Sequence, residues 1–213
     1  MAVIQQILAG SFPAAGGGAS GTTWDPSGKH ADITLTNSNR TATRTGGTGD
    51  YRNVRSITGK SSGKYYVECS NFTWLTADYN GIGLADVAFD VVNSTSWVGN
   101  FQNTVALYLN NSASYVYMNA GSILTASGHT SGQSIDMSID LDTMTLGFRI
   151  NNGSWEDASI GALTGTSWHF AASLRDGSSG SAATIVTNSG DWVRTPAAAF
   201  HSGRNGCPLL KQH

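Results

Sequence analysis

The segment between Gly132 and Gly153 constrains the fold of this chain more than any other, because it has the pattern of two β-strands joined by a tight turn. Four apolar residues alternate with four polar ones in its first half: Ile135, Met137, Ile139 and Leu141 against Asp136, Ser138, Asp140 and Asp142. A period of two places one set on a buried face of the sheet and the other on a solvent-exposed face. Residues 142–144 would make the turn and residues 145–150 the returning strand. Asn-Asn-Gly at 151–153 tolerates positive φ and predicts a second reversal.

Composition extends this β character to the whole chain. The 14 acidic residues include only two glutamates, Glu68 and Glu156. Glu and Lys are typical of surface helices, so their scarcity argues against a long amphipathic helix. The 26 glycines, with abundant Ser, Thr and Asn, favour a β protein with many turns. A length of 213 residues suffices for one sandwich core. The net charge of −2 gives no electrostatic reason to expect a nucleic-acid partner.

Other segments with strand-like patterns predict the rest of the sheets. These segments are residues 31–36, 41–44, 53–58, 63–68, 81–85, 105–109, 115–118, 169–174 and 183–187. In residues 115–118, Tyr115 and Tyr117 share one face while Val116 and Met118 share the other, so only one pair can face the core. Cys69 is expected as a small buried hydrophobe, and a disulfide with Cys207 is left open.

Several short motifs resemble those of the SPRY-domain family. Gly63-Lys64 with Tyr66 and Glu68 is similar to an early family strand, and residues 81–85, Gly-Ile-Gly-Leu-Ala, are similar to the strand that follows. The late hairpin matches through Asp140, Thr145, Leu146, Phe148, Asn152 and Gly153, and closing motifs fall at residues 170–174 and 186–190. Ser189 departs from the aromatic residue usual in the last motif. The resemblance covers about residues 24–193. It implies a concanavalin-like, all-β sandwich of two antiparallel sheets that binds partners through loops and usually carries no catalytic chemistry.

The two ends of the chain are expected to lie outside this domain. We predict a division into residues 1–23, an attachment peptide and Gly-rich linker; 24–193, the sandwich; and 194–213, a C-terminal arm. The apolar residues of the attachment peptide, spaced for one side of a short helix, are Val3, Ile4, Ile7 and Leu8. An apolar peptide on a glycine linker suggests docking onto another chain, and folding back on its own domain is the alternative. The start lacks the basic residues of a signal peptide and is interpreted as uncleaved, and no segment predicts membrane insertion.

Catalytic, cofactor and metal chemistry is not favoured by the sequence. Asp136, Asp140 and Asp142 share a strand face, but glycoside hydrolysis needs one carboxyl kept protonated in an apolar site, and this face is expected to be solvated. The five histidines have no paired spacing typical of a metal site. Glycines 46, 47 and 49 are interpreted as a hairpin turn rather than a phosphate-binding loop. The basic cluster of Arg40, Arg44, Arg52 and Arg55 is interpreted as a solvated strand face with turns.

Three aromatic residues in predicted loops are the candidates for binding. These residues are Tyr79, Trp97 and Trp155, which neighbour turn-forming or polar residues. Aromatic side chains on loops stack on sugars or anchor protein partners. The alternative is that Trp97 and Trp155 cap the sandwich without contacting any partner.

The start of the chain and its plain Thr/Asn/Gly-rich domain also resemble tailed-phage virion and prophage proteins. The resemblance implies a non-enzymatic structural protein of the head or tail. It would attach to other virion proteins through its N-terminal peptide, as part of a homo- or hetero-oligomeric assembly, and would reach the virion from the host cytoplasm. The displayed domain would bind a host-surface glycan or protein, or decorate the particle. The alternatives are a soluble SPRY-type adaptor that binds peptides and a glycan-active enzyme on a lectin-like fold.

Overall fold

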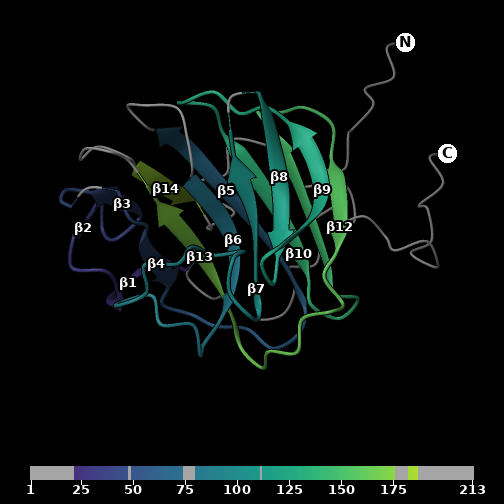
Figure 1. Ribbon diagram of the computed structural model, residues 1–213, viewed down its shortest axis with the longest axis horizontal. Helices are drawn as coiled ribbons and strands as arrows, with labels where there is room; N and C mark the ends of the chain where they lie inside the picture. Colours follow the sequence, from purple (N-terminus) through teal and green to yellow (C-terminus); the bar gives the residue numbers. More distant parts are fainter. Residues whose placement is uncertain (1–21, 48, 74–79, 111, 176–181, 187–213) are drawn as a thin grey trace, which may run out of the picture.

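The computed structural model describes residues 22–47, 49–73, 80–110, 112–175 and 182–186. Within these residues every regular element is a β-strand and every strand pair is antiparallel (Figure 1). The strands are β1 Trp24–Lys29, β2 Ile33–Thr36, β3 Thr41–Arg44, β4 Arg52–Ser56, β5 Lys64–Thr73, β6 Asn80–Asp86, β7 Thr104–Leu109, β8 Ala113–Met118, β9 Gly121–Ser127, β10 Ile135–Asp140, β11 Thr145–Ile150, β12 Glu156–Ser159, β13 Trp168–Leu174 and β14 Ala182–Val186.

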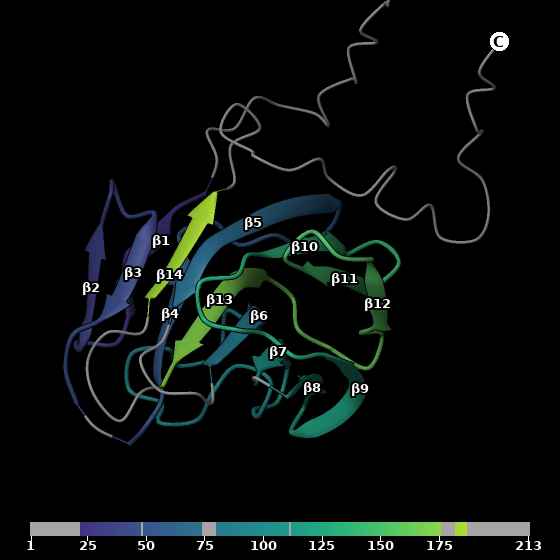
Figure 2. The ribbon, with the colours of Figure 1, turned by 90° about the horizontal axis from the view of Figure 1, so that it is seen from above.

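The strands form two seven-stranded sheets stacked as a sandwich. The first, called here the β7 sheet, has the order β1-β4-β13-β6-β7-β8-β9. The second, called the β10 sheet, has the order β12-β11-β10-β5-β14-β3-β2. Figure 2 shows the two layers edge-on, with β12 and β9 on one side and β2 and β1 on the other. The predicted all-β, two-sheet antiparallel sandwich is therefore confirmed.

The core lies between the inner faces of the two sheets. Trp24 of β1 stacks on Phe170 of β13 with ring centroids 5.6 Å apart, and both side chains are buried. Cys69 is also fully buried in this core, as expected for a small hydrophobe. Complete burial of each large apolar side chain stabilises the fold by about 1.5–3 kcal/mol, which is the main force that holds the two layers together.

The predicted hairpin of residues 132–153 forms β10 and β11, with Ile135 opposite Ile150 and Asp140 opposite Thr145. Asn151 and Asn152 adopt the positive φ values of 48° and 63° expected for the second reversal. The prediction of a solvated polar face is wrong for the strand itself, whereas Asp142 in the following turn is exposed. Of the four polar residues there, Asp136 is 1% exposed and Asp140 is 5% exposed. Basic side chains of the neighbouring strands form ion pairs with these carboxylates, so this face is buried although it is polar.

Three strands were not anticipated from the sequence. The edge strand β1 carries Pro26 and an irregular register with β4, and β12 contains only one apolar residue, Ala158. In β9, a bulge near Ile123 breaks the alternation. The predicted hairpin turn at glycines 46, 47 and 49 is also wrong, since β3 and β4 belong to different sheets and the connection crosses the sandwich. Irregular and edge strands lack the two-residue period on which the prediction depends.

Candidate binding surface

The outer face of the β7 sheet is lined by very small residues at its centre. Gly81 and Gly83 of β6 lie opposite Tyr108 and Ala106 of β7, and Gly83 also lies opposite Ala171 of β13. A Cβ added at Gly83 would overlap the backbone carbonyl oxygen of Val105. The absence of side chains on this part of β6 lets β7 and an overlying loop approach the sheet closely.

The connection between β6 and β7 packs into this space. Phe89, Val91, Trp97 and Val98 of the connection form a second buried apolar cluster with Ala85, Ala106 and Ala171 of the sheet. Polar bonds fix its path: Val98 N donates to Ser173 Oγ at 2.8 Å, and Asn53 Nδ2 donates to the carbonyl oxygens of Ser94 and Ser96 at 3.0 and 2.9 Å. The loop is therefore anchored to β4 and β13 at several points.

Three tyrosines continue this cluster toward the solvent. We call Tyr108, Tyr115 and Tyr117 the tyrosine ladder. The Trp97 ring lies 4.7 Å from the Tyr108 ring and 5.1 Å from the Tyr117 ring. Tyr117 in turn lies 5.6 Å from Tyr108 and 6.3 Å from Tyr115, in edge-to-face arrangements. All three tyrosines are partly exposed. Rings packed in this way on paired strands form a preorganised aromatic surface.

Tyr51 extends the aromatic surface on the other side of Trp97. The two rings are 5.9 Å apart, and the Arg175 guanidinium lies 5.4 Å from the Tyr51 ring centroid. Arg175 Nε also donates to the Gly49 carbonyl oxygen at 2.7 Å. The aromatic surface thus ends at a cation on one side and continues over uncharged strands on the other.

Of the predicted binding residues, the structure places Trp97 and Trp155 on different sheets. Trp97 is only 8% exposed and supports the tyrosine ladder from beneath. Trp155 is partly exposed and packs against Tyr66 and Arg149 of the opposite sheet. Tyr79 lies outside the described residues, as do the attachment-peptide residues Val3, Ile4, Ile7 and Leu8.

Sequence reasoning missed most of the ladder, although one signal for it was present. The alternation in residues 115–118 required that one pair of side chains face away from the core. Val116 is fully buried, so Tyr115 and Tyr117 are the outward pair. Tyr108 joins them because it lies directly opposite Tyr115 in the register, which local pattern alone cannot reveal.

The outer face of the β10 sheet holds a buried polar group built around Asp136. Arg149 Nε donates to Asp136 Oδ2 at 2.7 Å, and the guanidinium lies 4.8 Å from the Trp155 ring centroid. The Tyr66 hydroxyl donates to Glu68 Oε1 at 3.2 Å. Burial, followed by the nearby Asp136 and Glu68 carboxylates, raises the pKa of Tyr66. Glu68 is 0% and Asp136 1% exposed, so neither carboxylate has surface available to a sugar in this arrangement.

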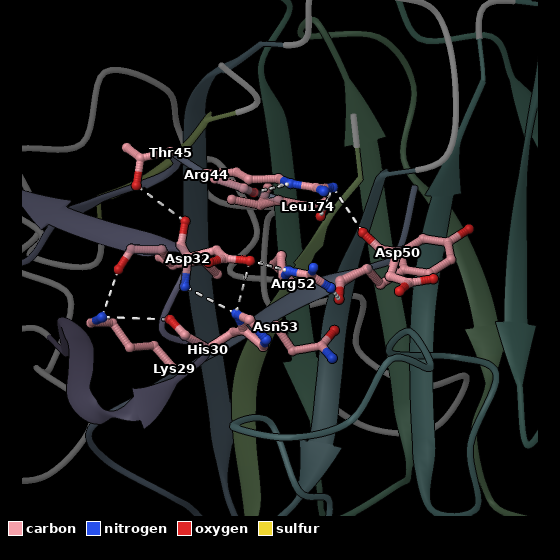
Figure 3. Close-up of polar contacts among 12 residues, drawn as sticks. Lys29, His30, Asp32, Arg44, Thr45, Asp50, Arg52, Asn53 and Leu174 are labelled. Carbon is pink, nitrogen blue, oxygen red and sulfur yellow. Dashed lines mark hydrogen bonds and ion pairs between the residues drawn. The ribbon is translucent and has the colours of Figure 1, made fainter. Parts of the chain in front are cut away.

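A second polar group links the β1–β2 turn to the first residue of β4, Arg52 (Figure 3). Arg52 Nε donates to Asp32 Oδ2 at 2.6 Å, and this bond holds the pKa of Asp32 below its usual range. Burial and the nearby Arg52 charge lower the pKa of His30. A Cβ at Gly47 would meet both partners of the ion pair, which explains a glycine at this crossing. The group therefore joins the β1–β2 turn to the start of β4.

Arg44 corrects the expectation of a solvated basic face. Its side chain is fully buried, with Nε donating to the Gly46 carbonyl oxygen at 3.0 Å and Nη1 to the Asp50 carbonyl oxygen at 2.8 Å (Figure 3). A planar guanidinium with five donors suits a turn that exposes several carbonyl groups to the interior. Arg44 therefore organises the crossing between the sheets.

No group of three or more His, Cys, Asp and Glu side chains lies close enough to hold a metal ion in the described part of the chain. Among the same residues, no helix is long and apolar enough to cross a membrane.

Comparison with solved structures identifies the fold as that of SPRY domains. The SPRY domain of human HERC1 superposes with a TM-score of 0.63 at 17% identity, covering 78% of this chain and 98% of that domain. The TRIM65 PSpry domain gives a TM-score of 0.62 at 13% identity over 78% of this chain and 90% of that chain. A stonustoxin structure gives 0.57 at 16% identity, covering 78% of this chain but only 27% of the toxin chain. No protein-family model and no curated protein sequence matches the chain.

Proposed function

We propose that this protein is a non-enzymatic binding module of the SPRY type, with the outer face of the β7 sheet as its contact surface. The observation that supports this most directly is the tyrosine ladder packed on Trp97. Tyrosines held by neighbouring rings lose little conformational freedom on binding, which is the property that makes them frequent anchors in interfaces. The two buried carboxylates on the opposite sheet, Glu68 and Asp136, support a structural rather than a catalytic role for that face.

We further propose that the module is displayed on a bacteriophage particle. The support comes from the sequence: an apolar peptide with Val3, Ile4, Ile7 and Leu8, a glycine-rich linker and a weakly charged domain. In this proposal residues 1–21 attach the protein to other virion proteins, and the sandwich faces outward, where the tyrosine ladder meets a molecule of the host surface. The arrangement separates attachment from recognition, so each can be tested alone.

The attachment half of the proposal is tested with the full-length protein and a version that begins at Thr22. Both are mixed with purified particles that lack the protein, and co-sedimentation is measured together with the native mass of each protein alone. We expect the full-length protein to sediment with particles and the shortened one to remain in solution. Equal sedimentation of both would overturn attachment through residues 1–21. Monomers that bind no particle would favour a soluble adaptor instead.

The recognition half is tested on intact host cells with Tyr108→Ala and Tyr115→Ala variants of the full-length protein. Removal of one partly exposed ring should weaken cell binding by about tenfold, corresponding to about 1.4 kcal/mol. Attachment to particles should be unchanged, because the ladder is not part of the attachment peptide. Wild-type cell binding by both variants would contradict the assignment of this surface.

A further inference from the structure

The elements that carry the tyrosine ladder lack charge altogether. Between Asp90 and Asp136 the sequence contains no Asp, Glu, Lys or Arg, although these residues make up 12% of the chain. The interval encodes all of β7, β8 and β9 and most of the β6–β7 connection, and these three strands lie side by side (Figure 1). Burial does not require this, since Ser122 and Thr125 of β9 are exposed and could carry charged side chains.

Hydroxyl groups stand beside the rings in this uncharged region. Thr125 is the register partner of Tyr115, and Ser122 is the register partner of Tyr117. Both partners are exposed, and so is Ile123, which lies at the bulge between them with 39% of its surface accessible. A row of partly exposed aromatic rings therefore runs next to a row of small hydroxyl side chains, on strands fixed by backbone pairing.

The combination of aromatic rings and hydroxyl groups without charged side chains favours some classes of ligand over others. Aromatic faces pack against the C–H face of a pyranose ring, while hydroxyl and amide side chains exchange hydrogen bonds with sugar hydroxyls. A nucleic acid or an acidic polysaccharide would require Lys or Arg, which the interval does not contain. A protein partner normally brings charged side chains to the rim of its interface, and complementary charges there give specificity and speed of association. The residues between Asp90 and Asp136 offer no charged side chain that could complement the charges of a protein partner.

We propose that the tyrosine ladder, together with Ser122 and Thr125, is a binding subsite for a neutral glycan. The inference rests on the proposed function and refines it, because it names the chemical class of the molecule that the displayed face meets. The rings of Tyr108, Tyr115 and Tyr117 would stack on successive sugar units, and Trp97 would fix the positions of Tyr108 and Tyr117 from beneath. No side chain of the subsite would gain or lose an ion pair on binding.

Binding of the full-length protein to immobilised polysaccharides tests the proposal. Dextran, mannan and galactan serve as neutral probes, and alginate and polygalacturonate as acidic ones. The variants are Tyr115→Ala, which removes a ring, and Tyr115→Phe, which keeps the ring and removes only its hydroxyl. Ile57→Ala is the control, because Ile57 is 56% exposed and lies outside the uncharged interval. Thermal unfolding of each variant confirms that it is folded before binding is compared.

We expect binding to at least one neutral polysaccharide, weakened about tenfold in Tyr115→Ala and changed by less than about threefold in Tyr115→Phe and Ile57→Ala. Raising NaCl from about 0.05 to 0.5 M should leave the affinity unchanged, because no charges are paired. Binding to the acidic polysaccharides alone, or neutral binding that Tyr115→Ala leaves intact, would overturn the proposal.

A parallel experiment on host cells separates this inference from the proposed function. Cells are treated with periodate, which cleaves the vicinal diols of sugars, or with a protease, before the full-length protein is added. Loss of binding after periodate and retention after protease supports the glycan subsite. Loss after protease alone overturns the glycan subsite and leaves cell recognition standing, now with a protein receptor. Absence of binding to untreated cells overturns host recognition itself.

Discussion

Individual buried polar residues decide how this sandwich responds to pH and substitution. His129 is fully buried beside Phe72, and its Nε2 lies 3.2 Å from the Gln133 carbonyl oxygen. Burial lowers the pKa of His129 from 6.5 to about 4. The folded protein therefore keeps this imidazole neutral over a pH range in which the unfolded chain is protonated.

The first prediction follows from that difference in proton binding. Between pH 6.5 and 4 the unfolded state binds more protons at His129 than the folded state, so the free energy of unfolding falls as the pH falls. The full shift corresponds to about 3 kcal/mol across this range. Urea unfolding at pH 7, 6, 5 and 4.5 should show a weaker pH dependence in His129→Asn than in the wild type. The pKa of partly buried His30 is also lowered, so His30 makes the free energy of unfolding fall with pH in the same way in the wild type and in the variant. Identical slopes would contradict the prediction.

The second prediction concerns the two ion pairs of β10, which differ in burial. Arg149 and Asp136 have side chains 11% and 1% exposed, whereas Lys64, which pairs with Asp140 at 2.9 Å, is 40% exposed. Arg149→Met removes the guanidinium from a buried carboxylate and should lower the free energy of unfolding by about 3–5 kcal/mol. Lys64→Met is the comparison and should cost less, about 1 kcal/mol, because Lys64 is largely solvated and the buried Asp140 keeps the bonds that it accepts from the Asp142 and Thr143 backbone N–H groups. Urea denaturation measures the free energy of unfolding of both variants. Equal losses would show that burial of the basic side chain does not determine how much an ion pair contributes to stability.

At the scale of a single element, β6 lies between the core and the aromatic surface of the β7 sheet. Its inward residues Ile82 and Leu84 are buried between the sheets, while Gly81 and Gly83 leave the outer face open for the β6–β7 connection. Trp97 can reach Tyr108 and Tyr117 only because this face carries no bulk. The arrangement of the aromatic surface thus depends on two glycines that lie beneath it.

The third prediction tests that dependence. In Gly83→Ala the new methyl group would overlap the Val105 backbone carbonyl, which cannot move without disturbing the β6–β7 pairing. We expect a loss of about 3 kcal/mol or more in the free energy of unfolding, together with a changed near-ultraviolet circular-dichroism spectrum, to which the displaced Trp97 ring contributes. At Gly161 the nearest atom, Ser159 Oγ, would lie 3.8 Å from a new Cβ, so Gly161→Ala should change stability by no more than about 0.5 kcal/mol. Equal stability of the two variants would refute the packing argument.

Elements with strict local periodicity were predictable, and the contacts between elements were not. The β10–β11 hairpin followed from its alternation and from the Asn-Asn-Gly reversal at 151–153. The burial of Asp136 did not, because its partner Arg149 lies on the neighbouring strand and its other neighbours include Tyr66 of β5. Trp97 lies in a polar stretch of sequence, yet it is buried because small residues on β6, β7 and β13 receive it. Whether a loop residue is buried depends on the surface that packs against it, and a sequence pattern does not show that surface.

At the scale of the whole molecule, the last two described strands occupy central positions. β13 lies between β4 and β6 in one sheet, and β14 lies between β5 and β3 in the other. Both sheets therefore bring together segments from opposite ends of the described chain, such as Ala183 of β14 with Ala42 of β3. Such long-range pairing makes folding slow, because the entropy of closing long loops is lost before the contacts that compensate for it can form.

The fourth prediction is that neither sheet forms until residues 168–186 are present. A chain that ends at Gly161 retains every other strand but lacks β13 and β14, and with them Ser173, which bonds to Asn53 and to Val98 of the β6–β7 connection. It should show no cooperative thermal transition, rapid proteolysis and no near-ultraviolet circular-dichroism signal, whereas the full chain should unfold in one transition. A cooperative transition in the shortened chain would mean that β1 to β12 form an independent unit. In the predicted case, the tyrosine ladder that we propose as the contact surface takes its final arrangement only after β13 and β14 have joined the sheets, because Ser173 of β13 and Asn53 of β4 hold the loop that carries Trp97.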